Sequence, residues 1–395
     1  MLGWEFPPLI NGGLGVACHG LSQALIRHVN LTIVLPRAEI SSKTSPLKLV
    51  GLTHLDSPDL TTPPPPLLFT PYEDAISPRE TLTENSSLYD GDLFERVTTY
   101  THAATEFAKN SNFDLIHAHD WMTALAGLAI RKATGKPLVF HVHSLTYDRA
   151  GPEERGWIYE IEKQVIADAD LIIPVSHYTR DICLTHYGGS PSKIFPVHNG
   201  VTPVTSFRTK PPFPEKLVLF LGRLTSQKAP HSFLQIAARI LAENTNVRFV
   251  LAGSGDQLPS LIEESISLGI ATKVHFPGFL NRGKIQQLLS QTDLYCMPSV
   301  SEPFGLSALE AAQFGIPIVL SKQSGASEVL PSARSADAWD LDGMTRQIAE
   351  LLTDQTAELE ASQAMMAEQK KCTWERAAEK VFGLYQMHLL RVPDY

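Results

Sequence analysis

The sequence predicts an α/β protein made of two Rossmann-like domains whose parallel sheets face each other across a cleft. Short, continuous apolar runs alternate with amphipathic stretches along the chain, which is typical of parallel strands covered by helices on both faces. This series occurs twice, with a proline- and threonine-rich stretch at Val201–Glu215 between the halves. The 395 residues also exceed what one core of ordinary size accommodates.

The first half is expected to open with a shortened strand and a glycine-rich loop. Met1 and Leu2 can supply only a stub of the strand that would precede such a loop, so we expect either a truncated first strand or a start codon assigned late. The loop should lead into a helix near Val16. Pro58–Pro78 contains seven prolines and is expected to be a surface excursion. The remaining strands are expected at Leu31–Leu35, Leu115–Ala118, Leu138–His143 and Leu171–Val175.

The second half repeats the alternation of strand and helix. Its strands are expected at Leu217–Leu221, Val247–Leu251, Lys273–Phe276, Leu294–Met297 and Ile316–Leu320, and its helices at Ser232–Glu243, Leu258–Ser267, Lys284–Ser290 and Leu306–Phe314. The tail from Thr373 to Arg391 has helical periodicity. We therefore expect domains at 1–202 and 203–375, with a C-terminal helix at 376–395 that packs back on the first domain.

Composition excludes several classes of function. The 33 basic and 42 acidic residues give a net charge of −9, so the chain has no general attraction for nucleic acid or anionic membranes. Four widely spaced cysteines suggest neither a zinc knuckle nor a disulfide framework and favour a cytoplasmic location. No apolar run approaches the roughly 18 residues of a membrane span; peripheral membrane contact stays open.

Two carboxylates flank a predicted helix start in the second half. In the run EPFGLSALE, Glu302 lies on a loop, Gly305 and Leu306 begin a helix, and Glu310 lies one to two turns inside it. A helix N-terminus suits a phosphate, and carboxylates accept hydrogen bonds from the hydroxyls of a sugar or ribose. The same run also fits an ordinary helix with one solvated glutamate, and by itself it does not distinguish the two.

Cations and glycines follow two of the predicted strands. Arg223 and Lys228 come directly after the strand that ends near Gly222, and Gly253 and Gly255 follow the next one. Ligands of parallel sheets bind at the carboxyl ends of the strands. Two cations at that edge of an acidic protein would suit a diphosphate, although each alone is more often a solvated surface charge.

Together these motifs resemble the retaining GT-B glycosyltransferases, namely glycosyltransferase family 4 and the glycogen and starch synthases. The resemblance covers nearly the whole chain, and it is carried by GWEFPPLINGGLG, LIHAHDW, FHVHSL, IIPVSHYTRD and VHNGV in the first half and by GRLTSQK, LAGSGD and EPFGLSALEA in the second. The set of motifs is specific for this superfamily and much less so for the substrate.

The resemblance implies a role for individual residues. Those expected to bind the nucleotide-sugar donor are Gly13, Leu14, Arg223, Lys228, Gly253, Gly305, Leu306 and Glu310, with the two cations on the diphosphate and Glu310 on the ribose. Glu302 would bind hydroxyls of the transferred sugar, His143 would lie beside that sugar, and Asp120 would line the same cleft. The family retains the anomeric configuration, and we assign no enzymic nucleophile.

Two H-x-H pairs, His117/His119 and His141/His143, allow a second interpretation of the first half. Residues two apart on a strand face the same way, so the pairs together with Asp120 could form a zinc site. The favoured alternative is that they are polar residues facing a cleft, one of which touches substrate. The family that the motifs resemble requires no metal in this interpretation, and we expect neither a metal nor another cofactor.

One departure from the pattern concerns the donor. The ADP-glucose-dependent synthases carry Lys two positions before the first glycine of the loop, where this chain has Ile10. This departure leaves the donor open between ADP- and UDP-glucose. The resemblance as a whole leads us to expect a retaining hexosyltransferase that moves glucose from one of these donors to an α-glucan. The alternatives are a family 4 enzyme of cell-surface polysaccharide, glycolipid or small-metabolite synthesis, a nucleotide-sugar 2-epimerase, and an inactive glucan-binding scaffold.

Overall fold

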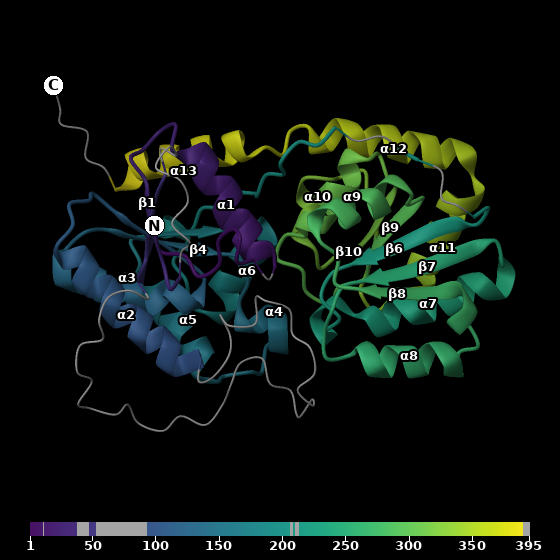
Figure 1. Cartoon of the computed structure of the whole chain (residues 1–395), viewed down its shortest axis with the longest axis horizontal. Coiled ribbons are helices and arrows are strands. Elements are labelled where there is room, and N and C mark those ends of the chain that lie inside the picture. The colour runs from purple at the N-terminus through teal and green to yellow at the C-terminus, as the bar shows by residue number, and fades with distance from the viewer. Residues whose placement is uncertain (11, 38–46, 53–92, 206–207, 210–212, 390–395) are drawn as a thin grey trace. The chain divides into compact units, whose positions relative to one another are not determined.

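The computed structural model describes residues 1–10, 12–37, 47–52, 93–205, 208–209 and 213–389 (Figure 1). The chain divides into two compact units. Unit 1 is Met1–Gly200 together with Trp374–Tyr395, and unit 2 is Val201–Thr373. The predicted surface excursion at Pro58–Pro78 lies outside the described residues. No helix in the described ranges is long and apolar enough to cross a membrane.

Unit 1 contains a parallel sheet that is completed by Leu2. Strand β1 (Thr32–Leu35) pairs with β2 (Lys48–Gly51), and β3 (Ile116–His119), β4 (Leu138–Val142) and β5 (Leu171–Pro174) pair in that order. The Leu2 N–H donates to His117 O at 2.7 Å, and Leu2 also bridges to Val34 of β1. The predicted stub of a first strand therefore pairs on both sides, which gives the order β2-β1-Leu2-β3-β4-β5.

The order of these strands has the double winding of a Rossmann sheet. From Leu2 the chain first adds β1 and β2 on one side, and it then returns to add β3, β4 and β5 on the other. The winding reverses between Leu2 and β3. In parallel sheets this switch point, at the carboxyl ends of the strands, is where ligands bind.

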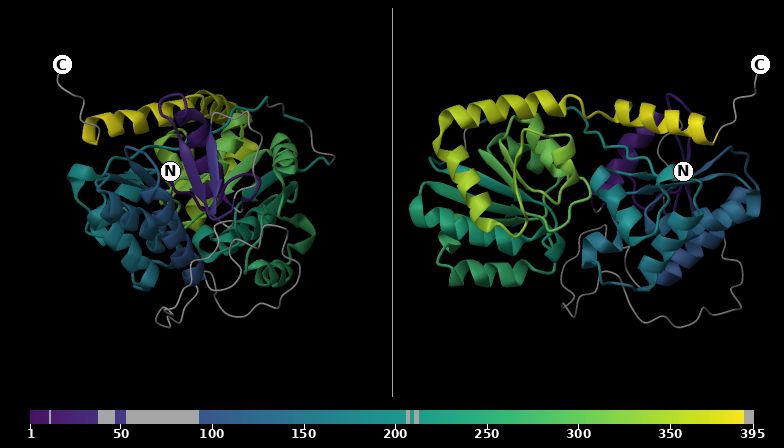
Figure 2. Two further views of the ribbon diagram at one scale, coloured as in Figure 1. Left: turned by 60° about the vertical axis from the view of Figure 1, so that its left-hand side comes forward. Right: turned by 180° about the vertical axis from the view of Figure 1, so that it is seen from behind.

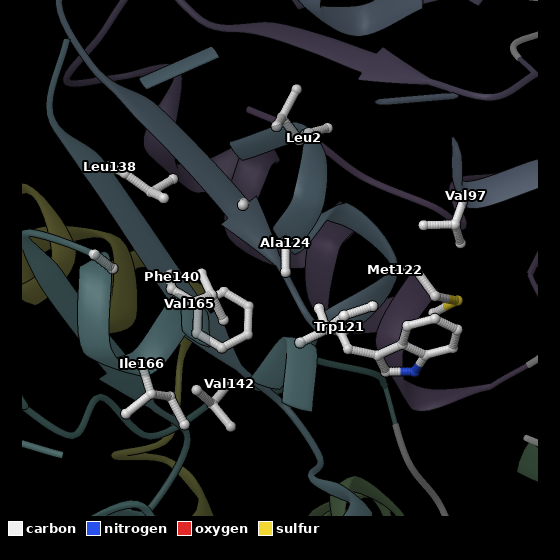
Figure 3. Close-up of a cluster of buried hydrophobic side chains, with 14 of the residues drawn as sticks. Leu2, Val97, Trp121, Met122, Ala124, Leu138, Phe140, Val142, Val165 and Ile166 are labelled. Atoms are coloured by element: carbon white, nitrogen blue, oxygen red, sulfur yellow. The ribbon is translucent and has the colours of Figure 1, made fainter. Parts of the chain in front are cut away.

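Helices cover both faces of this sheet; they are α1 (Gly13–Leu25), α2 (Leu93–Lys109), α3 (Trp121–Thr134), α4 (Thr146–Ala150), α5 (Trp157–Asp168), α6 (His177–His186) and α13 (Trp374–His388). On one face Phe140 and Val142 of β4 pack with Ala124 of α3 and Val165 of α5 (Figure 3). The alternate residues of β3 and β4 point to the other face.

Helix α1 begins three residues before the predicted start near Val16. Gly13 and Leu14 form its first turn, after Gly12 in an extended conformation. A Cβ on Gly15 would lie 2.9 Å from Cγ1 of Ile10, so glycine lets the first turn approach the incoming chain. Helix α13 lies alongside α1 (Figures 1 and 2), where Gly20 leaves room for the ring of Trp374.

Unit 2 has a six-stranded parallel sheet with the same double winding. Its order is β11 (Arg334–Ala336), β10 (Ile318–Ser321), β9 (Leu294–Met297), β6 (Lys216–Leu221), β7 (Val247–Ala252) and β8 (Val274–Gly278). From β6 the chain adds β7 and β8 on one side and then β9, β10 and β11 on the other. The switch point of unit 2 therefore lies between β6 and β9.

The helices of unit 2 are α7 (Pro230–Glu243), α8 (Leu258–Ser267), α9 (Arg282–Ser290), α10 (Leu306–Gln313), α11 (Leu341–Thr353) and α12 (Gln355–Gln369). Helices α7 and α8 lie on one face of the sheet, and α9, α10 and α12 on the other (Figure 1). Phe233 of α7 packs between Phe220 and Phe249, with ring centres 5.6 and 5.7 Å apart. The predicted fold class, two parallel Rossmann-like α/β units, is confirmed.

Candidate functional site

An ion pair lies at the switch point of unit 2. The loop after β6 carries Lys228, the loop after β9 carries Glu302, and the Lys228 ammonium contacts the Glu302 carboxylate. The two side chains are only 17% and 7% exposed. Because little water surrounds them, removing either charge would leave the other buried and unpaired unless a ligand replaced it.

Gln227 joins both loops to Arg223. Its side-chain N–H donates to Ser301 O at 3.1 Å, and its side-chain oxygen accepts from Arg223 Nη2 at 3.4 Å. The backbone N–H of Val300 donates to Gln227 O at 3.0 Å. Arg223 itself is exposed. Sequence reasoning did not select Gln227, although it lies inside the GRLTSQK motif.

The backbone around Glu302 is fixed by the loop that follows β10. Glu302 N–H donates to Gln323 O at 2.8 Å, and Gly325 N–H donates to Glu302 O at 2.9 Å. Gly305 then takes a φ of 92° immediately before α10, a conformation that favours glycine. Both features hold the Glu302 side chain beside the N-terminus of α10.

Glu310 lies in the second turn of α10, as predicted from the sequence. Burial raises the pKa of its carboxyl to about 6, an effect that Arg282 partly opposes. Near the start of the same helix, the Ser307 and Tyr295 hydroxyls are 2.7 Å apart. The structure thus gathers Arg223, Lys228, Glu302 and the start of α10 at the switch point, with Glu310 one turn further along the helix.

The predicted donor-binding Gly253 has a packing reason to be glycine. Its φ is 145°, and a Cβ there would lie 1.8 Å from Gly222 O. A Cβ on Gly255 would lie 2.2 Å from Leu224 O. These glycines allow the loop after β7 to pack directly against the loop that carries Arg223.

Asp120 lies at the switch point of unit 1, directly after β3. Its buried carboxylate accepts hydrogen bonds from the backbone N–H groups of His143, at 2.7 Å, and Ser144, at 3.2 Å. Burial raises the pKa of this carboxyl to about 7, although the same hydrogen bonds and Arg149 act in the opposite direction. Asp120 therefore holds the loop that carries His143.

Backbone strain is found at both switch points. Among the described residues, two that are not glycine have a positive φ: Asp120 at 57° and Ala229, next to Lys228, at 52°. Such conformations cost about 1–3 kcal/mol and tend to occur at functional sites. Their positions agree with the loops chosen from the sequence.

A second network also fixes the loop after β4. The buried Glu162 accepts from Thr146 N–H at 2.9 Å, from Tyr187 Oη at 2.8 Å and from Arg149 Nη2 at 2.6 Å. Arg149 Nη1 in turn donates to Ser144 Oγ at 3.2 Å. Sequence reasoning missed this network, whose members fall outside the recognised motifs except for Ser144.

The four histidines of the H-x-H pairs form a two-by-two array on the sheet face opposite α3 and α5. His117 Nε2 and His141 Nδ1 lie 3.1 Å apart, and His119 Nδ1 and His143 Nε2 lie 2.9 Å apart. Rings of one strand stack with centres 4.5 Å apart. His117 Nδ1 also contacts the Tyr385 hydroxyl of α13.

This array differs from the predicted row of cleft-facing polar residues. His117, His119 and His141 are 2%, 0% and 2% exposed, and only His143 is partly exposed. Burial lowers the pKa of His143 to about 3 and holds the pKa values of the other three well below their usual range. All four imidazoles are therefore neutral near pH 7. Tyr385 and Cys18, which help to enclose the array, gave no signal in the sequence.

Two family profiles match the chain nearly end to end. "Glycosyltransferase Family 4" matches residues 11–204, and "Glycosyl transferases group 1" matches residues 203–371. Together with the two Rossmann-like units, they define the class of the protein as a GT-B glycosyltransferase. Within this class the chain belongs to the family 4 glycosyltransferases.

Curated relatives share about a quarter of the residues. The glycogen synthase of Mycobacterium tuberculosis is 27% identical over 380 residues, with 90% of this chain and 86% of the relative covered. The D-inositol 3-phosphate glycosyltransferase of Corynebacterium diphtheriae is 26% identical over 324 residues, with 74% and 76% covered. The names of these two relatives indicate different acceptors.

Solved structures show the same fold at lower identity. The sucrose-phosphate synthase of Thermosynechococcus elongatus superposes with a TM-score of 0.75 at 19% identity, covering 98% of this chain and 95% of that one. The Anabaena protein HepE, in complex with UDP and glucose, has a TM-score of 0.69 at 18% identity, with 96% and 97% covered.

Proposed function

We propose that this glycosyltransferase is a retaining hexosyltransferase that moves glucose from a nucleotide-glucose donor to an α-glucan. The observation that carries the proposal is the ion pair of Lys228 and Glu302 at the switch point of unit 2, joined through Gln227 to Arg223. A pair of cations with a carboxylate beside a helix N-terminus suits a sugar diphosphate, which carries negative charge at one end and hydroxyls at the other.

In this proposal the donor changes the partners of the ion pair. The diphosphate takes Lys228 and the exposed Arg223, which neutralise the charge that develops as the nucleoside diphosphate departs. Glu302 is thereby released to accept hydrogen bonds from hydroxyls of the transferred sugar. The N–H groups of Gly305 and Leu306 bind phosphate, Glu310 accepts the ribose hydroxyls, and Gly253 admits the nucleotide.

Unit 1 supplies the remaining proposed residues. Gly13 and Leu14 are in the first turn of α1, whose N-terminus suits phosphate or the transferred sugar. We propose that His143 lies beside the transferred sugar as a neutral imidazole. Asp120 positions His143 in this proposal, because the Asp120 carboxylate accepts a hydrogen bond from the backbone N–H of His143. The transfer requires neither an enzymic nucleophile nor a metal ion in this proposal.

The acceptor and the donor base rest on different observations. The M. tuberculosis glycogen synthase, similar over 90% of this chain, supports an α-glucan acceptor. The C. diphtheriae enzyme supports the second candidate, transfer to a small metabolite. Ile10 in place of lysine weakens the case for ADP-glucose, and we propose UDP-glucose as the first donor to test.

All four cysteines are buried and no disulfide forms among the described residues, which supports a cytoplasmic location.

The test offers ADP-, UDP- and GDP-glucose with glycogen, maltooligosaccharide, inositol phosphate or no acceptor. We expect nucleoside diphosphate release coupled to glucan growth, with an α-linked product by NMR. A β-linked product would contradict retention. Epimerised sugar without acceptor would indicate the 2-epimerase, and glucan binding without turnover of any donor would indicate the scaffold.

A further inference from the structure

A thiol and two imidazoles converge on the sheet face that α1 covers in unit 1. Cys18 of α1, His119 of β3 and His143 after β4 each place one ligand atom so that the three lie within 4.8 Å of one another. In a tetrahedral zinc site, bonds of about 2.0–2.3 Å put the ligand atoms roughly 3.3–3.7 Å apart. Shifts of about 1 Å would bring this triad to that geometry.

One nitrogen of the triad is buried and unpaired. His119 Nε2 has no hydrogen-bond partner in the described part of the chain. An unpaired buried polar atom costs about 1–3 kcal/mol, and a metal ligated there would remove that cost.

A second triad, His117, His119 and His141, also brings its ligand atoms within 4.8 Å. It is the weaker candidate because both nitrogens of His117 are already engaged, one with Tyr385 and the other with His141. An ion there would break both contacts. The triad with Cys18 loses at most the contact between His119 and His143, and it contributes a thiolate, which transition metals prefer.

We propose that Cys18, His119 and His143 bind a transition-metal ion of the zinc class and that the bound ion inhibits sugar transfer. On binding, the Cys18 S–H loses its proton to solvent, a metal–sulfur bond forms, and the two imidazoles donate their lone pairs. Three protein ligands leave a fourth position for water. The inhibition rests on the proposed function, because it requires His143 beside the transferred sugar; ion binding does not.

Ion binding is measured with Co²⁺, which reports its ligands by absorption. Titration of the full-length chain should give the near-ultraviolet band of a cobalt–thiolate bond, and Zn²⁺ should abolish it by competition. Cys18→Ser should remove the band, and His119→Gln should weaken Co²⁺ binding by at least about tenfold. Cys183→Ser, which removes another buried thiol of unit 1, should leave the absorption band and the Co²⁺ affinity unchanged. Circular dichroism confirms that each variant is folded.

Two results would overturn the site: no thiolate band in the wild type, or an undiminished band in folded Cys18→Ser. For the inhibitory role, Zn²⁺ should suppress glucosyl transfer by the wild type and spare Cys18→Ser, whose basal rate should be normal. Equal Zn²⁺ sensitivity of the two proteins would refute that role. If no donor supports transfer, the cobalt titration still decides whether the site exists.

Discussion

At the residue scale, the candidate site of unit 2 depends on a few charges held in place by neutral side chains. Lys228 and Glu302 satisfy each other, and Gln227 links Arg223 to the loop that carries Glu302. The charged residues could be found from the sequence because strand ends and helix starts mark where ligands bind. Gln227 could not, because its two contacts depend on how the loops after β6 and β9 meet.

Arg223→Ala and Glu302→Ala should each lower kcat/KM for the nucleotide-sugar donor by at least about tenfold. Each removes a charged contact worth about 1.5–3 kcal/mol in the transition state. Steady-state kinetics with varied donor measures the loss. Arg239→Ala is the matched control, because it removes an arginine of α7 whose exposed ion pair with Asp342 lies in the same unit. Wild-type rates in both site variants would show that the site is misplaced.

Asp120 permits a sharper comparison of two substitutions. Asp120→Asn keeps a side-chain oxygen that accepts the backbone N–H groups of His143 and Ser144. Asparagine and alanine both carry a Cβ, so the strained backbone at φ 57° and ψ 175° affects the two variants alike. Asp120→Ala leaves these two partly buried N–H groups without their acceptor. We expect the alanine variant to be less stable than the asparagine variant by about 1–3 kcal/mol in urea unfolding. Equal stabilities would mean that the carboxylate does not hold this loop.

At the scale of elements, close packing of neighbouring loops explains why glycine follows β7. The loop after β7 touches the loop after β6 at Gly253, where a side chain would overlap Gly222 O. From the sequence, Gly253 is expected to bind the nucleotide-sugar donor. The structure adds a packing reason for the glycine, namely the close approach of the two loops, and this reason is compatible with a role in donor binding.

Gly253→Ala should therefore be more harmful than another glycine substitution at positive φ. Gly278, at the end of β8, has a φ of 72°, and a Cβ added to it would have no atom within 4 Å, so Gly278→Ala adds only backbone strain. We expect Gly253→Ala to destabilise unit 2 by about 1–3 kcal/mol more than Gly278→Ala and to weaken donor binding. Urea unfolding and calorimetric titration of UDP measure the two effects, and equal losses in both variants would contradict the packing argument.

The histidine array marks the limit of sequence reasoning at this scale. Period two on β3 and β4 correctly predicts that the histidines of each pair face the same way. Their burial depends on α1 and on α13, whose Tyr385 is 268 residues from His117, and no local pattern reports a contact that distant.

At the scale of the whole molecule, the buried titratable groups of unit 1 make its stability depend on pH. The described part of unit 1 encloses four histidines that stay neutral when folded and one carboxyl, Asp120, whose pKa is raised to about 7. In the unfolded chain histidine titrates near 6.5 and aspartate near 3.9. The two kinds of group therefore act oppositely on stability as pH falls.

Below pH 6.5 the four histidines bind up to four protons in the unfolded chain and none in the folded one. Asp120 acts in the opposite direction, because it binds a proton in the folded chain but remains ionised in the unfolded chain down to about pH 3.9. Taken alone, these five groups give a net difference of about three protons, so they lower the stability of unit 1 by up to roughly 4 kcal/mol per pH unit once the unfolded histidines are charged. The loss begins near pH 6.5 and continues toward the pKa of His143, about 3.

Tryptophan fluorescence can follow this transition in urea, with EDTA present to keep metal ions away. Trp4, Trp121, Trp157 and Trp374 belong to unit 1, and Trp339 of unit 2 is already 75% exposed. The urea midpoint should fall steeply from pH 6.5 to 5, and His141→Gln, which removes one titrating group, should reduce the slope by about 1.4 kcal/mol per pH unit. A midpoint that stays constant over this range would show that the histidines are not held neutral in the folded protein.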